Sequence, residues 1–247
     1  MSVQRSMLPA VVITGTSILV GCGGSSGSGS CSSASCNVPP PGTGGVFDGT
    51  VQGTPAIAIL ADNGDMRIGV QNGTYYHLTV APQSQMISGT YFAYSTGPAF
   101  PNGTQSTTGT VSATEGSSTT NGTLTDHSGT KQTLALTDEA VYNTGSALSN
   151  LSGTWSYTAN GFSLTATISP GGTLTAVDSN GCTYAGSFTQ INELYDAYGE
   201  SHVLTCNGVT TSYNGLATYL PPSGSTTAQI ELLADDGAGG FLVVTFQ

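Results

Sequence analysis

Two stretches of the sequence carry residue types that serine hydrolases use. Residues 23–27 read Gly-Gly-Ser-Ser-Gly, which fits the Gly-x-Ser-x-Gly pattern of a nucleophile elbow, and Asp126, His127 and Ser128 are consecutive. An elbow needs a strand before its serine and a helix after it, whereas 23–27 lies in a low-complexity run. The members of a triad converge from separate segments, which three neighbours in one turn cannot do. We therefore expect a tether at 23–27 and a polar turn at 126–128.

Two other histidines could act as general bases if a carboxylate positioned them. His77 and His202 fall on expected strands. Because side chains alternate along a strand, His202 shares a face with Glu200 and could also approach Asp196. Spacing alone does not establish a positioned base. We therefore assign no catalytic residue and expect that the protein is not an enzyme.

Metal ligands are also sparse. Residues 62–65 read Asp-Asn-Gly-Asp and resemble part of a calcium loop, but the remaining ligands and the distal glutamate are missing. Zinc sites use tight Cys or His pairs at set spacing, and the sequence contains none. We expect a hairpin turn at 62–65, with weak calcium binding as the alternative, and neither a metal nor a cofactor.

Short strands must position these residues. Asn-Gly pairs recur along the chain, and both residues tolerate the positive φ that a type I′ hairpin turn requires. The pairs lie at 63–64, 72–73, 102–103, 121–122, 160–161, 180–181, 207–208 and 214–215. Between the turns, apolar and polar residues often alternate, as in 162–168. This pattern predicts an all-β chain, with helix limited to a turn or two near 138–142.

A repeat appears when the sequence is shifted by 108 residues. Residues 45–80 then match 153–188 at 8 of 36 positions, including several turn residues. Each half contains eight expected strands. The fold class is therefore two tandem antiparallel eight-stranded meander barrels, with two β-sandwiches as the alternative. The expected strands lie near 45–51, 56–62, 65–71, 74–81, 86–95, 106–115, 118–125 and 131–137, and near 153–159, 161–169, 173–178, 182–191, 194–206, 209–219, 226–235 and 240–246.

The second half opens on Gly153-Thr154-Trp155. This tripeptide, at the start of eight strands, resembles the Gly-x-Trp start of lipocalins and avidins. That resemblance implies a meander barrel with a small ligand at its mouth and the tryptophan at its base. The arginine that lipocalins pack against the tryptophan and the other tryptophans of avidins are missing. The tandem arrangement is also similar to the paired barrel lobes of transferrin-binding surface lipoproteins.

The N-terminus has the pattern of a secretory signal. Arg5 precedes an apolar run of 14 residues, 7–20, which is short for a spanning helix. Leu19-Val20-Gly21-Cys22 resembles the lipobox of bacterial lipoproteins. The resemblance implies removal of 1–21 and attachment of acyl chains such as palmitate to Cys22. Gly23 replaces the aspartate that retains such proteins at the inner membrane, which implies the outer membrane, on its periplasmic face or the cell surface.

Charge and cysteine content agree with export. The chain has 3 basic and 14 acidic residues, and loss of 1–21 would leave only Arg67 and Lys131 as cations. Nucleic-acid binding needs basic clusters, so we exclude it. Apart from Cys22, four cysteines remain, an even number that suits an oxidising compartment. We expect Cys182 to pair with Cys206 across two neighbouring strands, joined by a hairpin turn near 193–194. This leaves Cys31 to pair with Cys36.

The expected organisation is a signal peptide (1–21), a flexible Gly/Ser/Pro-rich tether (22–44), and barrels at 45–148 and 149–247. The tether would be disordered and lipid-anchored at Cys22. The expected function is a non-catalytic binding or structural role at the cell envelope. The partner besides the membrane would be a small apolar ligand, a glycan or another protein. The alternatives are an envelope-directed hydrolase, and an inhibitor of a host or rival enzyme that uses loop 96–105.

Overall fold

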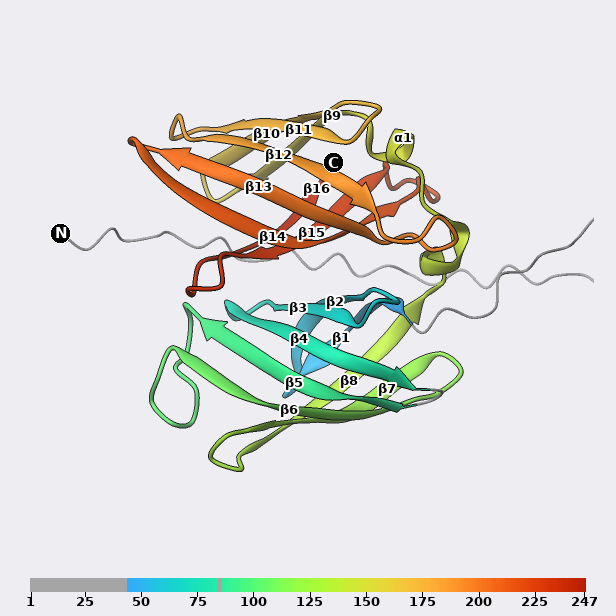
Figure 1. Ribbon diagram of the computed structural model, residues 1–247, viewed down its shortest axis with the longest axis vertical. Coiled ribbons are helices and arrows are strands. Elements are labelled where there is room, and N and C mark those ends of the chain that lie inside the picture. The colour runs from blue at the N-terminus through green and yellow to red at the C-terminus, as the bar shows by residue number, and fades with distance from the viewer. Residues whose placement is uncertain (1–43, 84–85) are drawn as a thin grey trace, which may run out of the picture.

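The computed structural model describes residues 44–83 and 86–247, which form sixteen strands in two antiparallel meanders (Figure 1). The first meander, barrel 1, lies below the second, barrel 2, in this view. Its strands are β1 (Gly45–Val51), β2 (Thr54–Leu60), β3 (Asp65–Val70), β4 (Thr74–Gln83), β5 (Met86–Ser95), β6 (Ser106–Glu115), β7 (Thr119–Asp126) and β8 (Lys131–Glu139). Barrel 2 consists of β9 (Gly153–Ala159), β10 (Phe162–Ile168), β11 (Thr173–Asp178), β12 (Thr183–Gln190), β13 (Tyr198–Cys206), β14 (Val209–Leu220), β15 (Gln229–Asp235) and β16 (Phe241–Phe246).

The two barrels close to different extents. In barrel 1, β8 pairs with β1 over six consecutive registers, so the sheet has no edge. In barrel 2, β9 and β16 meet through reciprocal backbone hydrogen bonds between Ser156 and Gln247, at 2.8 and 2.9 Å. Barrel 2 is therefore nearly closed. The all-β expectation of two eight-stranded meander barrels is confirmed, rather than the β-sandwich alternative.

The 108-residue offset is visible in the strand boundaries. β1 and β9 begin and end 108 residues apart, and so do β3 and β11. Phe47 and Trp155 occupy corresponding positions, and each packs inside its own barrel. The Trp155 indole N–H donates to the Leu151 carbonyl at 2.7 Å, so the tryptophan lies at the end of barrel 2 where the chain enters. This is the position that the Gly-x-Trp resemblance implied.

Turn chemistry explains the spacing of the strands. Asn160 and Gly161 have φ of 49° and 80°, and Asn207 and Gly208 have 51° and 77°. Two successive residues with positive φ make the type I′ turn, whose twist matches that of antiparallel strands. Each pair joins two strands by two residues, which fixes their register.

Three local features differ from the sequence expectation or refine it. The helical turn expected near 138–142 is a 3-10 helix, η1 (Ala140–Thr144). A short helix, α1 (Leu148–Leu151), was not expected. β13 begins at Tyr198 rather than at 194, because 191–197 forms a loop whose Tyr195 and Ala197 are buried between the barrels. The hairpin expected near 193–194 is confirmed, because Gln190 lies opposite Tyr198 and residues 191–197 form the turn between them.

A disulfide joins Cys182 to Cys206, as the strand pairing predicted. β12 and β13 place Thr183 opposite Thr205, so the two cysteines extend the ladder by one residue. The expected signal peptide 1–21 and residues 22–43 of the expected tether, with Cys22, Cys31 and Cys36, lie outside the described residues. Within the described part of the chain, no helix is long and apolar enough to cross a membrane.

Candidate functional site

Three apolar clusters organise the molecule, one inside each barrel and one between them. The third, here called the interface cluster, consists of buried outward-facing strand residues together with buried residues of η1 and of the loops beside the strands. Because outward-facing side chains normally meet water, their burial shows that the barrels pack directly on each other. Its members are Val46, Ile59, Ala61, Tyr75, Tyr142, Tyr195, Ala197, Leu216 and Leu233.

Arg67 on β3 lies at the edge of this cluster, with only 4% of its surface exposed. Its Nε donates to Asp65 Oδ1 at 2.7 Å and its Nη2 to Asp65 Oδ2 at 3.0 Å, a bidentate pair within barrel 1. Its Nη1 donates to the carboxylate of Asp235 at the end of β15 and to the Asn214 carbonyl at 3.3 Å. A single guanidinium therefore joins the two barrels.

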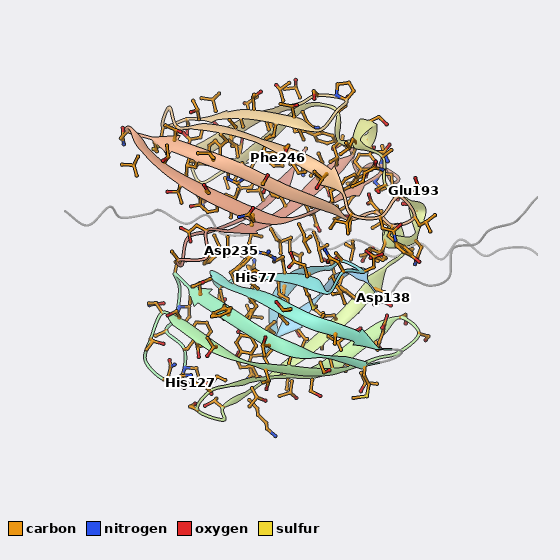
Figure 2. The ribbon with its side chains drawn as sticks, viewed as in Figure 1. His77, His127, Asp138, Glu193, Asp235 and Phe246 are labelled. Atoms are coloured by element: carbon orange, nitrogen blue, oxygen red, sulfur yellow. A yellow bond between two sulfur atoms is a disulfide. The ribbon has the colours of Figure 1, made fainter. Side chains whose placement is uncertain are left out.

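His77 on β4 completes this ion network. Figure 2 shows His77 and Asp235 facing each other across the junction of the barrels. His77 Nδ1 lies 3.2 Å from Asp235 Oδ2, and its Nε2 lies 3.6 Å from Asp65 Oδ1. Each nitrogen of His77 thus faces a carboxylate, and each carboxylate also contacts Arg67.

The network sets the charges at the junction. Burial alone would lower the pKa of Arg67, but Tyr75, Asp65 and Asp235 outweigh it and raise the pKa. Burial alone would raise the pKa of Asp235, but the hydrogen bond from His77 and the charge of Arg67 lower it. Arg67 and Asp235 therefore form a buried ion pair. Removing one partner lowers the stability of the fold, because the other charge stays buried without compensation.

A cleft of about 320 Å³ opens beside the network, between the two barrels. Asn63 and Asp65, from the β2–β3 turn and the start of β3, form the barrel 1 side. The barrel 2 side comes from the end of β12, from the start of the loop 191–197, and from β13 and β14. Its lining residues are Thr189, Ile191, Gly199, Glu200, Ser201, Asn214, Gly215 and Leu216. Sites of this size at the junction of two folded units are common places for small ligands.

A second charged group lies at the junction. Glu231 on β15 is half-buried, and its pKa is raised to about 8 by burial and by the charges of Asp48 and Glu139 on barrel 1. The pKa values of Asp48 and Glu139 are also raised, chiefly by burial. These three carboxylates repel one another when ionised, so their protonation favours contact between the barrels.

We expect this group to make stability depend on pH. An unfolded glutamate has a pKa of about 4.3, so between pH 4.3 and 8 folded Glu231 retains a proton that the unfolded chain has lost. The free energy of unfolding should therefore fall as the pH rises, by at most about 1.4 kcal/mol per pH unit. Thermal unfolding at pH 5 and pH 8 measures this change. Glu231→Gln should reduce the dependence, whereas Glu193→Gln, on an exposed loop residue, should leave it as in the wild type.

The interior of barrel 2 contains the histidine–carboxylate pair that the strand pattern indicated. His202 Nδ1 lies 2.6 Å from Glu200 Oε1, and their side chains are 2% and 0% exposed. The His202 ring stacks on Tyr213 at a centroid distance of 5.0 Å. His202 Nε2 and Glu200 Oε2 have no hydrogen-bond partner among the described residues. The pair is enclosed by aromatic rings.

Asp196, the other carboxylate considered for His202, has a different environment. It accepts hydrogen bonds from Thr218 Oγ1 at 2.9 Å and from the Tyr219 backbone N–H at 3.0 Å. Burial raises its pKa to about 6. It therefore fixes the loop before β13 against β14 and does not contact the histidine.

The remaining sequence candidates form turns. Ser128 donates to Asp126 at 2.6 Å, while His127 Nδ1 lies 3.3 Å from Thr107 Oγ1, so the three neighbours form a polar turn, as expected. At 62–65, the Asp65 carboxylate is paired with Arg67, and Asp62 accepts from Asn192 at 2.6 Å. The expected hairpin turn is confirmed there. Among the described residues, no group of three His, Cys, Asp or Glu could hold a metal ion.

The sequence did not identify Arg67 and Asp235 as partners, although it contained an indication. Apolar and polar residues hardly alternate along β15, which contains the apolar residues Ile230, Leu232, Leu233 and Ala234. A strand that is apolar on both faces is typical of burial on both sides. This pattern could have shown that the outer face of β15 is covered.

Comparisons with known proteins give one likeness. Neither a protein-family model nor a curated protein matches the chain. A crystal structure of a "putative outer membrane protein" from Bacteroides fragilis is similar over 83% of this chain and 96% of the other, with 11% sequence identity and a TM-score of 0.28. A TM-score this low identifies neither a shared fold nor a shared function.

Proposed function

We propose that the protein is an exported, non-catalytic binding protein that holds a small polar ligand in the cleft between its barrels. The observation that carries this proposal is the cleft itself, about 320 Å³ in volume and lined from both barrels. The Arg67–Asp235 pair and the interface cluster hold its two sides together, so the site is preorganised. Preorganisation reduces the entropy lost on binding.

Several observations favour binding over catalysis. Asp65, the carboxylate of the barrel 1 side, is paired with Arg67 and faces His77. His202 is enclosed inside barrel 2 and does not line the cleft. Loop 96–105, which could have plugged the active site of another enzyme, packs on barrel 1 through Phe100, only 6% exposed. A ligand-holding role therefore fits the geometry better than hydrolysis or inhibition.

Blocking the cleft should abolish binding. Ser201 is exposed, points outward from β13 and lines the cleft, so Ser201→Tyr should fill it without disturbing either core. Native mass spectrometry of the detergent-solubilised protein should show a co-purified ligand in the wild type and none in this variant. Val203→Tyr is the matched control, two residues further along the same outer face. A ligand that remains on Ser201→Tyr would contradict this assignment of the site.

We further propose that acyl chains on Cys22 hold the protein on the outer membrane. The lipobox resemblance and the single disulfide of the described residues support this proposal. Stable attachment needs at least two lipid chains, which this modification would exceed. Labelled palmitate should be incorporated into the wild type and into Cys31→Ala but not into Cys22→Ala, which should also be missing from outer-membrane fractions. Labelling of Cys22→Ala would contradict lipidation at this residue.

A further inference from the structure

Gly199 lines the cleft from the outer face of β13. Tyr198 and Glu200 on either side of it are buried inside barrel 2, so Gly199 occupies an outward position on β13. Its strand neighbours are Thr189 on β12 and Leu216 on β14, which form the adjacent walls. Glycine weakens a strand interior and often marks a place where another group approaches closely.

A side chain at this position would occupy the hollow. A β-carbon built on Gly199 would lie 3.0 Å from Thr189 Oγ1 and 3.8 Å from Ile191 Cγ1. The cleft therefore has room at this outward position of β13 because no side chain occupies it. Its base consists of backbone and of the aliphatic side chains of Ile191 and Leu216.

The exposed polar side chains around the cleft are uncharged except at Asp65, because the Glu200 side chain is 0% exposed inside barrel 2. Asn63 and Asn214 each contribute an amide, which can donate and accept hydrogen bonds, and Ser201 contributes a hydroxyl. All three residues are exposed. An apolar base under a rim of amides and hydroxyls complements a molecule with a flat C–H face and an edge of hydroxyl groups.

The charges disfavour an ionic ligand. Arg67, the nearest cation, already donates to Asp65, to Asp235 and to the Asn214 carbonyl. With a formal net charge of −11, the chain also repels anions over a longer range. Both carboxylate oxygens of Asp65 already accept hydrogen bonds from Arg67, so they offer a cation little as well. The ligand that fits this balance is neutral.

We propose that the cleft binds an uncharged sugar, with one ring lying on Gly199 and its hydroxyls directed toward Asn63, Ser201 and Asn214. This assignment rests on the proposed function and specifies its ligand class. A volume of about 320 Å³ lies at the small end of ligand sites, so the cleft accommodates a mono- or disaccharide unit.

Isothermal titration calorimetry on the detergent-solubilised full chain tests the assignment. The probes are maltose, cellobiose and diacetylchitobiose as neutral sugars, digalacturonate as an acidic sugar and spermidine as a cation. At least one neutral sugar should bind, and Gly199→Val and Ser201→Tyr should each weaken it by about tenfold or more, a loss of about 1.4 kcal/mol. Val203→Tyr should bind as the wild type does. Circular dichroism shows whether each variant is folded. If Gly199→Val does not fold, Ser201→Tyr tests the assignment by itself.

The other outcomes overturn the assignment in distinguishable ways. If digalacturonate or spermidine binds and Ser201→Tyr abolishes this binding, the cleft is a ligand site but not one for neutral sugars. If none of the probes binds while a co-purified ligand is lost from Ser201→Tyr, the sugar class is wrong and the binding role remains. If a neutral sugar binds equally to the wild type and to Ser201→Tyr, its site lies elsewhere and the assignment to the cleft is wrong.

Discussion

Arg67→Leu is expected to destabilise the protein by about 3–5 kcal/mol, because it leaves the Asp235 carboxylate, 5% exposed, without its ion partner between the barrels. Asp65 loses its bidentate partner in the same substitution. Urea denaturation measures the change, and small-angle scattering should show the barrels separated or the chain expanded. The effect is large because the carboxylate remains buried when the cation is removed.

A matched control is provided by Lys131, the other basic residue of the described chain. It is exposed on β8, so Lys131→Ala should change stability by less than about 0.5 kcal/mol. Adding Asp235→Leu to Arg67→Leu should recover part of the loss, because it removes the unpaired buried charge. Equal stability of Arg67→Leu and Lys131→Ala would show that the guanidinium does not hold the barrels together.

These ion-pair partners show where sequence reasoning reaches its limit. The Asn-Gly pairs at 160–161 and 207–208 specify a turn by local conformation, so the strands beside them could be placed from the sequence. The pairing of Cys182 with Cys206 followed because neighbouring strands bring them opposite each other. Local geometry and strand adjacency thus determine each barrel.

The junction of the barrels depends on longer-range information. Arg67 and Asp235 are 168 residues apart, and neither residue type nor periodicity relates two outward-facing positions on different barrels. The cleft could not be anticipated for the same reason, since Asn63 and Asn214 meet only after the barrels pack. Residues 194–197 were assigned to the strand that follows them, because burial of Tyr195 and Ala197 by the other barrel could not be seen. The contact between His202 and Glu200 was predictable because it lies within one strand.

Glu200→Met is expected to cost about 3 kcal/mol or more, because it leaves His202 buried among aromatic rings without the acceptor of its Nδ1 hydrogen bond. Methionine is close to glutamate in size, so the loss would arise from the missing partner rather than from a cavity. Denaturation by urea measures it. Val203→Thr, on the outer face of the same strand, should stay within about 0.5 kcal/mol of the wild type.

The double variant separates a structural role from a functional one. Adding His202→Phe to Glu200→Met removes both polar groups and keeps a ring to stack on Tyr213, so the stability should return to within about 1 kcal/mol of the wild type or exceed it. The contributions of Glu200 and His202 to stability would then be coupled. Their interaction energy is the change in the double variant minus the sum of the changes in the two single variants. Losses that simply add would show that the two residues act independently. If the stable double variant still carries the co-purified ligand, the buried pair is not needed for binding, as expected because the side chains of both residues are buried inside barrel 2 and only the chain at Glu200 borders the cleft.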